Sequence, residues 1–353
     1  IDPLIMIDKY GADAFRFSLA AFAAQGRDIK FSEDRVEGYK NFINKLWNAA
    51  KFILMNLPDD FRQLAPVDEW SKDLDITGRW ILSRLSLTTQ EVDEALSQYR
   101  FNDAATEVYQ FIWHEFCDWY IELSKPVLYS EEESALKTAT RHCLVYILEN
   151  ILKLLHPFMP FVTEELWQSL PHTEGSIMIK EYPLYRERDQ KAEQEMEIVI
   201  DAISGIRSIR GELNIAPSKE LDVILKPDDA DSERVLRENS KYISKMAKTS
   251  SITIASDATG GKGIATSVRE HVEVYIPLEG LLDVDSEIGR LNKDLKKLTQ
   301  NLMTLEKKLL NEDFLSKAPR EVVEKEKRRY NELTEKKEKL LESIKRLEEL
   351  KGE

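Results

Sequence analysis

Apolar residues recur at intervals of three and four positions through most of the first 170 residues, a spacing that predicts helices rather than strands. The breaks fall at Pro58, the Pro66 region, Pro126 and the HPFMPF run that begins at His156. The helices expected between these breaks cover residues 36–57, 76–98, 102–123, 132–155 and 161–170. Long helices joined by short connections pack antiparallel, so this part of the chain predicts a helix bundle.

The helix expected over residues 38–52, GYKNFINKLWNAAKF, has two different faces. One face is apolar and is predicted to enter the core: Tyr39, Ile43, Leu46, Trp47 and Ala50. The other face carries amides, an ammonium group and a phenyl ring: Asn41, Lys45, Asn48 and Phe52. A ring among Asn and Lys side chains suits stacking on unpaired bases with contacts to phosphate. The alternative is that another helix covers Phe52, and the residues alone leave both possibilities open.

The third expected helix is apolar on nearly all sides, which predicts a position in the middle of the bundle. Three carboxylates nevertheless line up on it at spacings of three and four: Glu115, Asp118 and Glu122. Carboxylates on a buried helix need cationic partners, and the candidates are Arg79, Arg84, Arg100 and Lys45. Acid–base catalysis is the less favoured alternative, because no metal ligand or nucleophile accompanies them. No residue is therefore assigned as catalytic or as a metal ligand.

Beyond residue 170 the pattern changes to a smaller unit with mixed elements. Helices are expected at residues 190–210 and 231–247, and strands at residues 221–225, 251–255 and 264–277. This order predicts an α+β domain of roughly 90 residues. Arg207 and Arg210 lie one helical turn apart within it. They are interpreted either as a phosphate-facing corner or as ordinary surface pairing.

The last segment repeats leucine and isoleucine at alternating steps of three and four, which predicts a coiled coil. The first seam comprises Ile288, Leu291, Leu295, Leu298, Leu302, Leu305 and Leu309. The second seam comprises Val323, Glu326, Tyr330, Leu333, Lys337, Leu340, Ile344 and Leu347. Because the run NEDFLSKAP interrupts the pattern between two seams of similar length, we expect an antiparallel hairpin. Basic residues concentrate near its tip.

Composition narrows the class of protein without identifying it. The chain has 353 residues, of which 42% are hydrophobic, and a net charge of -14, which argues against a simple basic nucleic-acid binder. No apolar run approaches the roughly 20 residues of a membrane span, and we expect a cytoplasmic protein with no membrane partner. Cys117 and Cys143 lie inside apolar helical patterns, which favours reduced core residues over a disulfide or a zinc site.

Six stretches in the same order as in one known family carry a resemblance that spans essentially the whole chain. They are IDPLIMIDKYGADAFRFSLA, GRDIKFSEDRVEGYKNFINKLWNAAKF, WHEFCDWYIELSKP, LHPFMPFVTEELWQ, IRSIRGELNIAPSK and NEDFLSKAP. Together they resemble the C-terminal part of the valyl-tRNA synthetases, which are class I aminoacyl-tRNA synthetases. In that family the IDPL segment follows the loop that stabilises the reacting ATP, while the other activation motif and the editing domain lie upstream. The resemblance therefore implies a tRNA-binding region of valine-tRNA ligase that is catalytically inactive alone and holds no cofactor, ATP and Mg²⁺ serving the full-length enzyme.

The resemblance also implies a division of the chain into four parts. Residues 1–35 end the catalytic core, 36–188 form the anticodon-binding bundle, 189–280 form the α+β linker domain and 281–353 form the coiled-coil arm. The partners expected are valine tRNA and the remainder of the synthetase chain. A monomer is expected, because an antiparallel hairpin buries its own seam. Two other readings stay open: a structural module that docks or self-associates through its coiled coil, and a general nucleic-acid binder.

The residues predicted to meet tRNA fall into two groups. The anticodon group is Lys45, Asn48, Lys51 and Phe52, of which the resemblance maps Lys51 and Phe52 onto the family's anticodon contacts. Lys51 stands where Arg is common in the family, which leaves a phosphate or single-donor contact in place of a bidentate one. The group predicted for the elbow and backbone of the tRNA is Arg207, Arg210, Phe314, Lys317, Arg320, Lys327 and Arg328.

Overall fold

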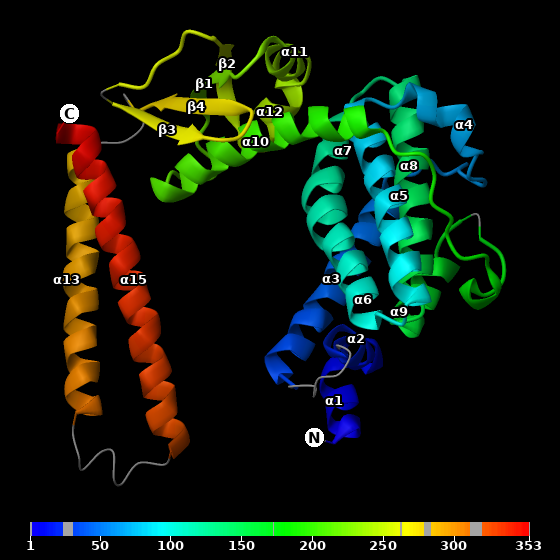
Figure 1. Cartoon of the computed structure of the whole chain (residues 1–353), viewed down its shortest axis with the longest axis horizontal. Helices are drawn as coiled ribbons and strands as arrows, with labels where there is room; N and C mark the ends of the chain where they lie inside the picture. Colours follow the sequence, from blue (N-terminus) through cyan, green and yellow to red (C-terminus); the bar gives the residue numbers. More distant parts are fainter. Residues whose placement is uncertain are drawn as a thin grey trace. The chain divides into compact units, whose positions relative to one another are not determined.

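The computed structural model describes residues 2–23, 31–171, 173–261, 263–278, 284–310 and 320–352. The chain divides into two compact units, Ile1–Glu197 and Ile198–Glu353. The first unit is helical, and the second combines a four-stranded sheet, helices and a long helical hairpin (Figure 1). The predicted fold class, mainly α with a bundle, a small α+β domain and a coiled-coil hairpin, is confirmed. The expected boundaries after residues 35, 188 and 280 stay predictions.

The first unit begins with three helices that share one small core. Helices α1 (Pro3–Tyr10) and α2 (Ala12–Phe22) meet at Gly11, whose φ of +91° favours glycine. Helix α3 spans Glu33–Met55 and packs Val36 against Met6, Tyr10 and Ala14. These contacts fix the N-terminal half of α3 and leave its C-terminal half to the bundle.

The bundle is built from α3 and four further segments that pack together (Figure 1). They are α5 (Ile76–Ser97), the run α6 (Phe101–Gln110), η2 (Phe111–Tyr120) and α7 (Ile121–Leu128), then α8 (Ala135–Leu155) and α9 (Pro160–Gln168). Shorter turns complete the unit: α4 (Val67–Trp70), η1 (Ser71–Asp73) and η3 (Ile177–Ile179). None of the described helices has the length and apolarity needed to cross a membrane.

The expected helix at 102–123 is longer and less regular than predicted. Its middle, η2, is a π-helix, and α7 continues past Pro126 to Leu128. The prediction of a break at Pro126 was therefore wrong. The wider turns of η2 change which side chains face α3, and π-helical segments are frequent at functional sites.

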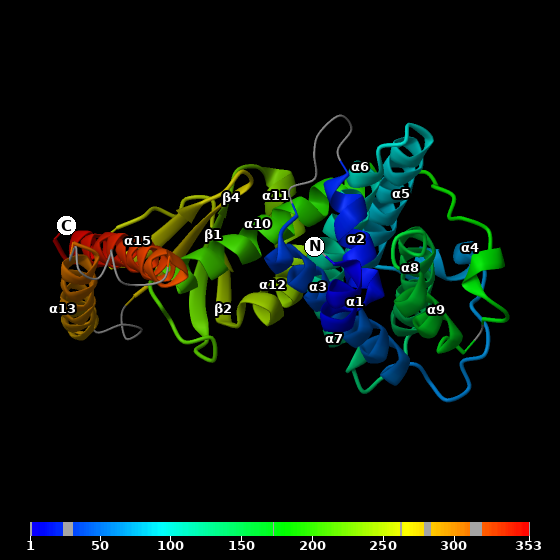
Figure 2. The ribbon, with the colours of Figure 1, turned by 90° about the horizontal axis from the view of Figure 1, so that it is seen from below.

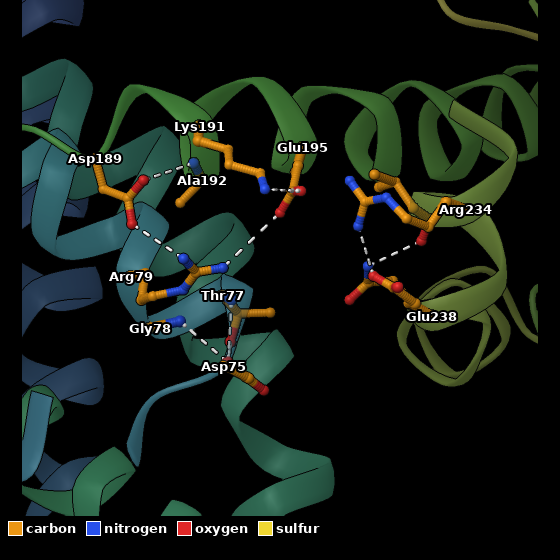
Figure 3. Close-up of polar contacts among 12 residues, drawn as sticks. Asp75, Thr77, Gly78, Arg79, Asp189, Lys191, Ala192, Glu195, Arg234 and Glu238 are labelled. Carbon is orange, nitrogen blue, oxygen red and sulfur yellow. Dashed lines mark hydrogen bonds and ion pairs between the residues drawn. The ribbon is translucent and has the colours of Figure 1, made fainter. Parts of the chain in front are cut away.

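Helix α10 (Gln190–Glu212) is tied to α5 at its N-terminal end by charged side chains (Figure 3). Asp75 caps α5 by accepting the N–H groups of Thr77 and Gly78. One turn on, Arg79 Nη1 lies 3.2 Å from Asp189 Oδ2, and Asp189 Oδ1 accepts the Ala192 N–H at 2.9 Å. The same carboxylate therefore caps α10 and binds α5.

The sheet of the second unit has the strand order β2-β1-β4-β3. Strand β1 (Leu221–Pro227) pairs parallel with β2 (Thr249–Ile254) and antiparallel with β4 (Val272–Pro277), which pairs antiparallel with β3 (Ile264–Val268). Helix α10 approaches β4 closely at Gly205, where an added Cβ would lie 2.7 Å from Val274 Cγ2. A larger residue at this position would force Val274 or the helix to shift.

Two expected elements of this unit are each split in the structure. The helix predicted at 231–247 is α11 (Ala230–Glu238) followed by α12 (Ser240–Ala247), because buried Asn239 turns its side chain onto the Val235 carbonyl at 2.9 Å. The strand predicted at 264–277 is the hairpin β3–β4, whose turn is closed by the Arg269 N–H on the Val272 carbonyl at 3.0 Å. Both single-element predictions were wrong.

The helical hairpin consists of α13 (Val284–Leu309) and α15 (Arg320–Gly352), which run side by side (Figures 1 and 2). The predicted seams meet, with six of their residues buried: Leu291, Leu298, Leu302, Leu305, Ile344 and Leu347. Lys308 Nζ pairs with Glu326 Oε1 across the two helices at 2.8 Å. The predicted antiparallel coiled coil is confirmed.

Candidate nucleic-acid interface

Helix α3 and the η2–α7 segment run parallel and share a ladder of contacts. Along this ladder Phe42 meets Trp113, Lys45 meets Asp118, and Phe52 meets Lys125. Residue numbers increase in the same direction on both elements, so both segments end at the same side of the bundle. The predicted anticodon residues lie on this edge of α3 or on its exposed neighbouring face.

Lys45 is held by the bundle rather than extended into solvent. Its Nζ lies 2.5 Å from Asp118 Oδ1 and 3.9 Å from the centre of the Trp113 ring, and its side chain is 26% exposed. Cation–π contact and ion pairing together fix this ammonium group. Contact of Lys45 with RNA remains a prediction, but its first role is internal.

The three carboxylates of the third helix each have a cationic partner. Arg84 donates two hydrogen bonds to Glu115, at 2.7 and 2.8 Å, and this bonding raises the pKa of the Arg84 guanidinium. Asp118 is paired with Lys45, and Glu122 accepts from Lys125 at 2.6 Å. Arg84 and Lys45 are thus confirmed as partners, whereas Arg79 binds Asp189 and Arg100 binds Asp103. Ion pairing within the bundle therefore explains all three carboxylates without a catalytic role.

Phe52 is half-buried, and the ammonium of Lys125 lies 5.7 Å from its ring centre. Helix α7 therefore covers part of the ring, which is the alternative that the sequence left open, while the rest stays accessible. Lys51 and Asn48 are exposed. The ammonium of Lys125 therefore lies over the Phe52 ring, and Lys51 is the preceding residue on α3.

The end of the α3–α7 pair carries exposed apolar and aromatic groups that sequence reasoning missed. Met55, one turn beyond Phe52, is 74% exposed, and Tyr129, one turn beyond Lys125, is 64% exposed. We call Lys51, Phe52, Met55, Lys125 and Tyr129 the terminal patch. Their shared position depends on where two helices end, which no local pattern reveals.

The predicted apolar face of α3 needs one correction. Trp47 is 42% exposed, whereas Phe42 is fully buried against Phe17, Tyr109 and Trp113. The buried stripe is Phe42, Leu46, Ala49, Ala50 and Ile53. The helix is rotated relative to the prediction because η2 packs on the side of Phe42.

The second predicted group has mixed outcomes. Arg207 and Arg210 donate to backbone carbonyls of their own domain. Lys327 and Arg328 are exposed on α15. Phe314 and Lys317 lie outside the described residues, and so does the side chain of Arg320, the first residue of α15. Their contact with RNA stays a prediction. Over the described part of the chain, no group of three His, Cys, Asp or Glu side chains is arranged to hold a metal ion.

Two stretches of the chain match models of known protein families. Residues 78–225 match the model of the anticodon-binding domain of tRNA ligases, which covers most of the bundle. Residues 283–348 match the model of the valyl tRNA synthetase tRNA binding arm, which covers the helical hairpin. The chain thus has the domains of an aminoacyl-tRNA synthetase.

The curated relatives that match this chain are valine–tRNA ligases. The valine–tRNA ligase of Geobacter sulfurreducens is 47% identical over 99% of this chain and 40% of its own length. Those of Syntrophotalea carbinolica and Listeria innocua are 45% and 43% identical over 95% and 99% of the chain. Nearly the whole chain is thus similar to valine–tRNA ligases, and it carries a match to their tRNA binding arm. It spans about 40% of the length of these relatives.

Proposed function

We propose that this chain binds valine tRNA and recognises its anticodon with the terminal patch of the bundle. The observation that carries the proposal is the half-buried Phe52 ring, with Lys51 beside it and Lys125 and Tyr129 on the neighbouring helix. An accessible ring can stack on an unpaired base, and flanking ammonium groups can bind its phosphate. The match to an anticodon-binding domain over residues 78–225 includes Lys125 and Tyr129 and supports this role for the bundle.

The coiled coil serves as the second contact in this proposal. Lys327 and Arg328 are exposed on α15, and with Phe314, Lys317 and Arg320 they form the predicted surface for the tRNA elbow. ATP-dependent valine activation, transfer and editing, with their ATP and Mg²⁺, belong to the portion of the relatives that this chain does not match. The chain works as a monomer in the cytoplasm, joined to that remainder of the synthetase.

The test measures the affinity of the chain for a valine tRNA transcript and for one with a changed anticodon, by fluorescence anisotropy at fixed salt. Phe52→Ala is expected to weaken binding by roughly 5- to 150-fold, the equivalent of one stacked base. Phe161→Ala is the matched control, because this phenyl group is 66% exposed on α9. Unchanged affinity for Phe52→Ala, together with equal affinity for both transcripts, would overturn the proposal.

A further inference from the structure

The α+β domain has a corner where the end of α10, the loop after it and the end of α12 meet. Arg210 holds this corner together by donating to four backbone carbonyls: those of Ala216 at 2.9 Å, Lys219 at 2.7 Å, Ala247 at 2.9 Å and Lys248 at 3.1 Å. One turn earlier, Arg207 Nη2 donates to the Met246 carbonyl at 3.1 Å. Two arginines of one helix therefore bind two separate pieces of backbone, residues 216–219 and 246–248.

This bonding brings lysines from distant parts of the sequence to one place. Lys219 and Lys248 lie 29 positions apart, yet their carbonyls accept from the same guanidinium. Lys245 precedes Lys248 by about one helical turn on α12. We call Arg207, Arg210, Lys219, Lys245 and Lys248 the basic corner. Its acidic neighbours in sequence are Glu212, which accepts from Ser208 at 3.3 Å, and Glu220.

Lys245 and Lys248 differ from the arginines of the neighbouring helix α11. On α11, Arg234 pairs with Asp231 and Glu238, and Arg237 pairs with Glu233. Lys245 and Lys248 are exposed, and over the residues that the structure describes their ammonium groups form no ion pair. On a chain with net charge -14, two exposed lysines one helical turn apart and without an ion pair in the described residues require an explanation.

The backbone of the corner is also fixed where the lysines emerge. Lys248 has a φ of +53° and ends α12, and its carbonyl accepts both from Arg210 and from the Leu221 N–H at 3.2 Å. The Cα positions are thus held while the ammonium groups can turn. Compact point charges on flexible stems suit phosphate oxygens and carry no base specificity.

We infer that the basic corner binds the phosphodiester backbone of the same tRNA, independently of its sequence. Lys245 and Lys248 lie between the two stretches matched by family models, 78–225 and 283–348. Arg207 and Arg210 position the corner, while Lys245 and Lys248 make the contacts. The inference rests on the proposed function only in taking tRNA as the ligand.

The test compares the salt dependence of tRNA binding in the full chain and in Lys245→Gln/Lys248→Asn, where Asn tolerates the left-handed backbone at position 248. Each lost phosphate contact should lower the slope of log affinity against log salt by about 0.7 to 0.9. We expect a slope smaller by about 1.5 and affinity reduced roughly 3- to 10-fold at moderate salt. Lys245→Arg/Lys248→Arg should restore the slope.

Arg234→Gln is the control, because it removes one charge from the same domain at a side chain already paired with Glu238 (Figure 3). A wild-type slope in the double lysine variant would overturn the inference, and so would an equal loss in Arg234→Gln. Either result leaves the proposed function standing if the anticodon change still weakens binding. If the two transcripts bind equally while the lysine substitutions still lower the slope, the proposed anticodon recognition fails and the inference about the basic corner stands.

A second readout locates the contact directly. Cys117 and Cys143 are buried, so Lys245→Cys offers a single exposed thiol for a photocrosslinker. We expect a crosslink to valine tRNA that high salt abolishes. The same probe in Arg234→Cys should give none, and equal crosslinking at both positions would contradict the inference.

Discussion

Lys45 and Asp118 form an ion pair between α3 and η2, with Nζ 2.5 Å from Oδ1. The same ammonium lies 3.9 Å from the centre of the Trp113 ring. Lys45 therefore links two helices, whereas Lys51, two turns further on, is exposed. Both lysines lie on α3 and were predicted to contact the anticodon. Their surroundings differ, because Lys45 is held by its contacts with η2, which suits a role in stability, whereas the exposed Lys51 is available to bind RNA.

Substitution of these two lysines should separate the two roles. Lys45→Met is expected to lower the free energy of unfolding by about 1 kcal/mol, because it removes a cation–π contact and a partly exposed ion pair. Lys51→Gln should leave unfolding unchanged and weaken tRNA binding roughly 3- to 10-fold through a lost phosphate contact. Urea titrations and anisotropy measure the two effects. Equal losses of affinity in both variants would contradict this division.

Tyr129 provides a separate test of the terminal patch. Because its side chain is 64% exposed at the end of α7, Tyr129→Ala should change the melting temperature little. Loss of one stacking surface should nevertheless weaken valine tRNA binding by about 1 to 3 kcal/mol. Tyr129→Phe keeps the ring and serves as the control. If the two variants bind alike, the ring takes no part in recognition.

The helices of the bundle follow from local periodicity, but the faces of α3 do not. The periodicity correctly predicted that Leu46 and Ala50 are buried in the core. The prediction also placed Trp47 in the core, but Phe42 takes that place, because Tyr109 at the end of α6 and Trp113 in η2 pack against Phe42. A shift in the partner helix therefore rotates the buried stripe, and a single helix considered alone contains no sign of it.

The candidate site was predictable to the extent that it lies on one helix. Lys51 and Phe52 came from a resemblance between sequences, while Met55, Lys125 and Tyr129 join them only through the parallel packing of α3 on α7. Likewise, Arg207 and Arg210 were recognised as a pair of cations. The helix predicted at 231–247 ended at the residue where α12 ends, but nothing in the sequence showed that this end packs against α10. The bonds from Arg207 to the Met246 carbonyl and from Arg210 to the carbonyls of Ala247 and Lys248 depend on that packing.

Arg210→Lys should distinguish bracing from charge in the basic corner. Lysine keeps the positive charge but cannot donate in a planar fork to the carbonyls of Ala216, Lys219, Ala247 and Lys248. We expect a loss of about 2 kcal/mol in the stability of this unit. Amide hydrogen exchange at residues 213–221 and 246–249 would report it locally. Unchanged protection there would show that the four bonds do not hold the corner.

The two buried thiols predict a loss of stability in mildly alkaline solution. Burial raises the pKa of both Cys117 and Cys143 to about 12, whereas an unfolded thiol titrates near pH 8.5. The folded state therefore keeps two protons that the unfolded state releases, so the stabilisation is complete below about pH 8.5 and declines as the pH rises towards 12. Each thiol can contribute a slope of about 1.4 kcal/mol per pH unit.

The useful window for this measurement is about pH 8.5 to 9.5, because buried tyrosines with raised pKa, such as Tyr39 and Tyr182, add their own dependence once unfolded phenols titrate near pH 10. Urea unfolding at several pH values in this window should show the decline, and Cys143→Ala should reduce its slope by about half. Alkylation with iodoacetamide at pH 8 should modify neither thiol until urea unfolds the bundle. Rapid modification of Cys143 in the native chain would mean that its side of the bundle opens without global unfolding, and the slope would then be shallower than two buried thiols require.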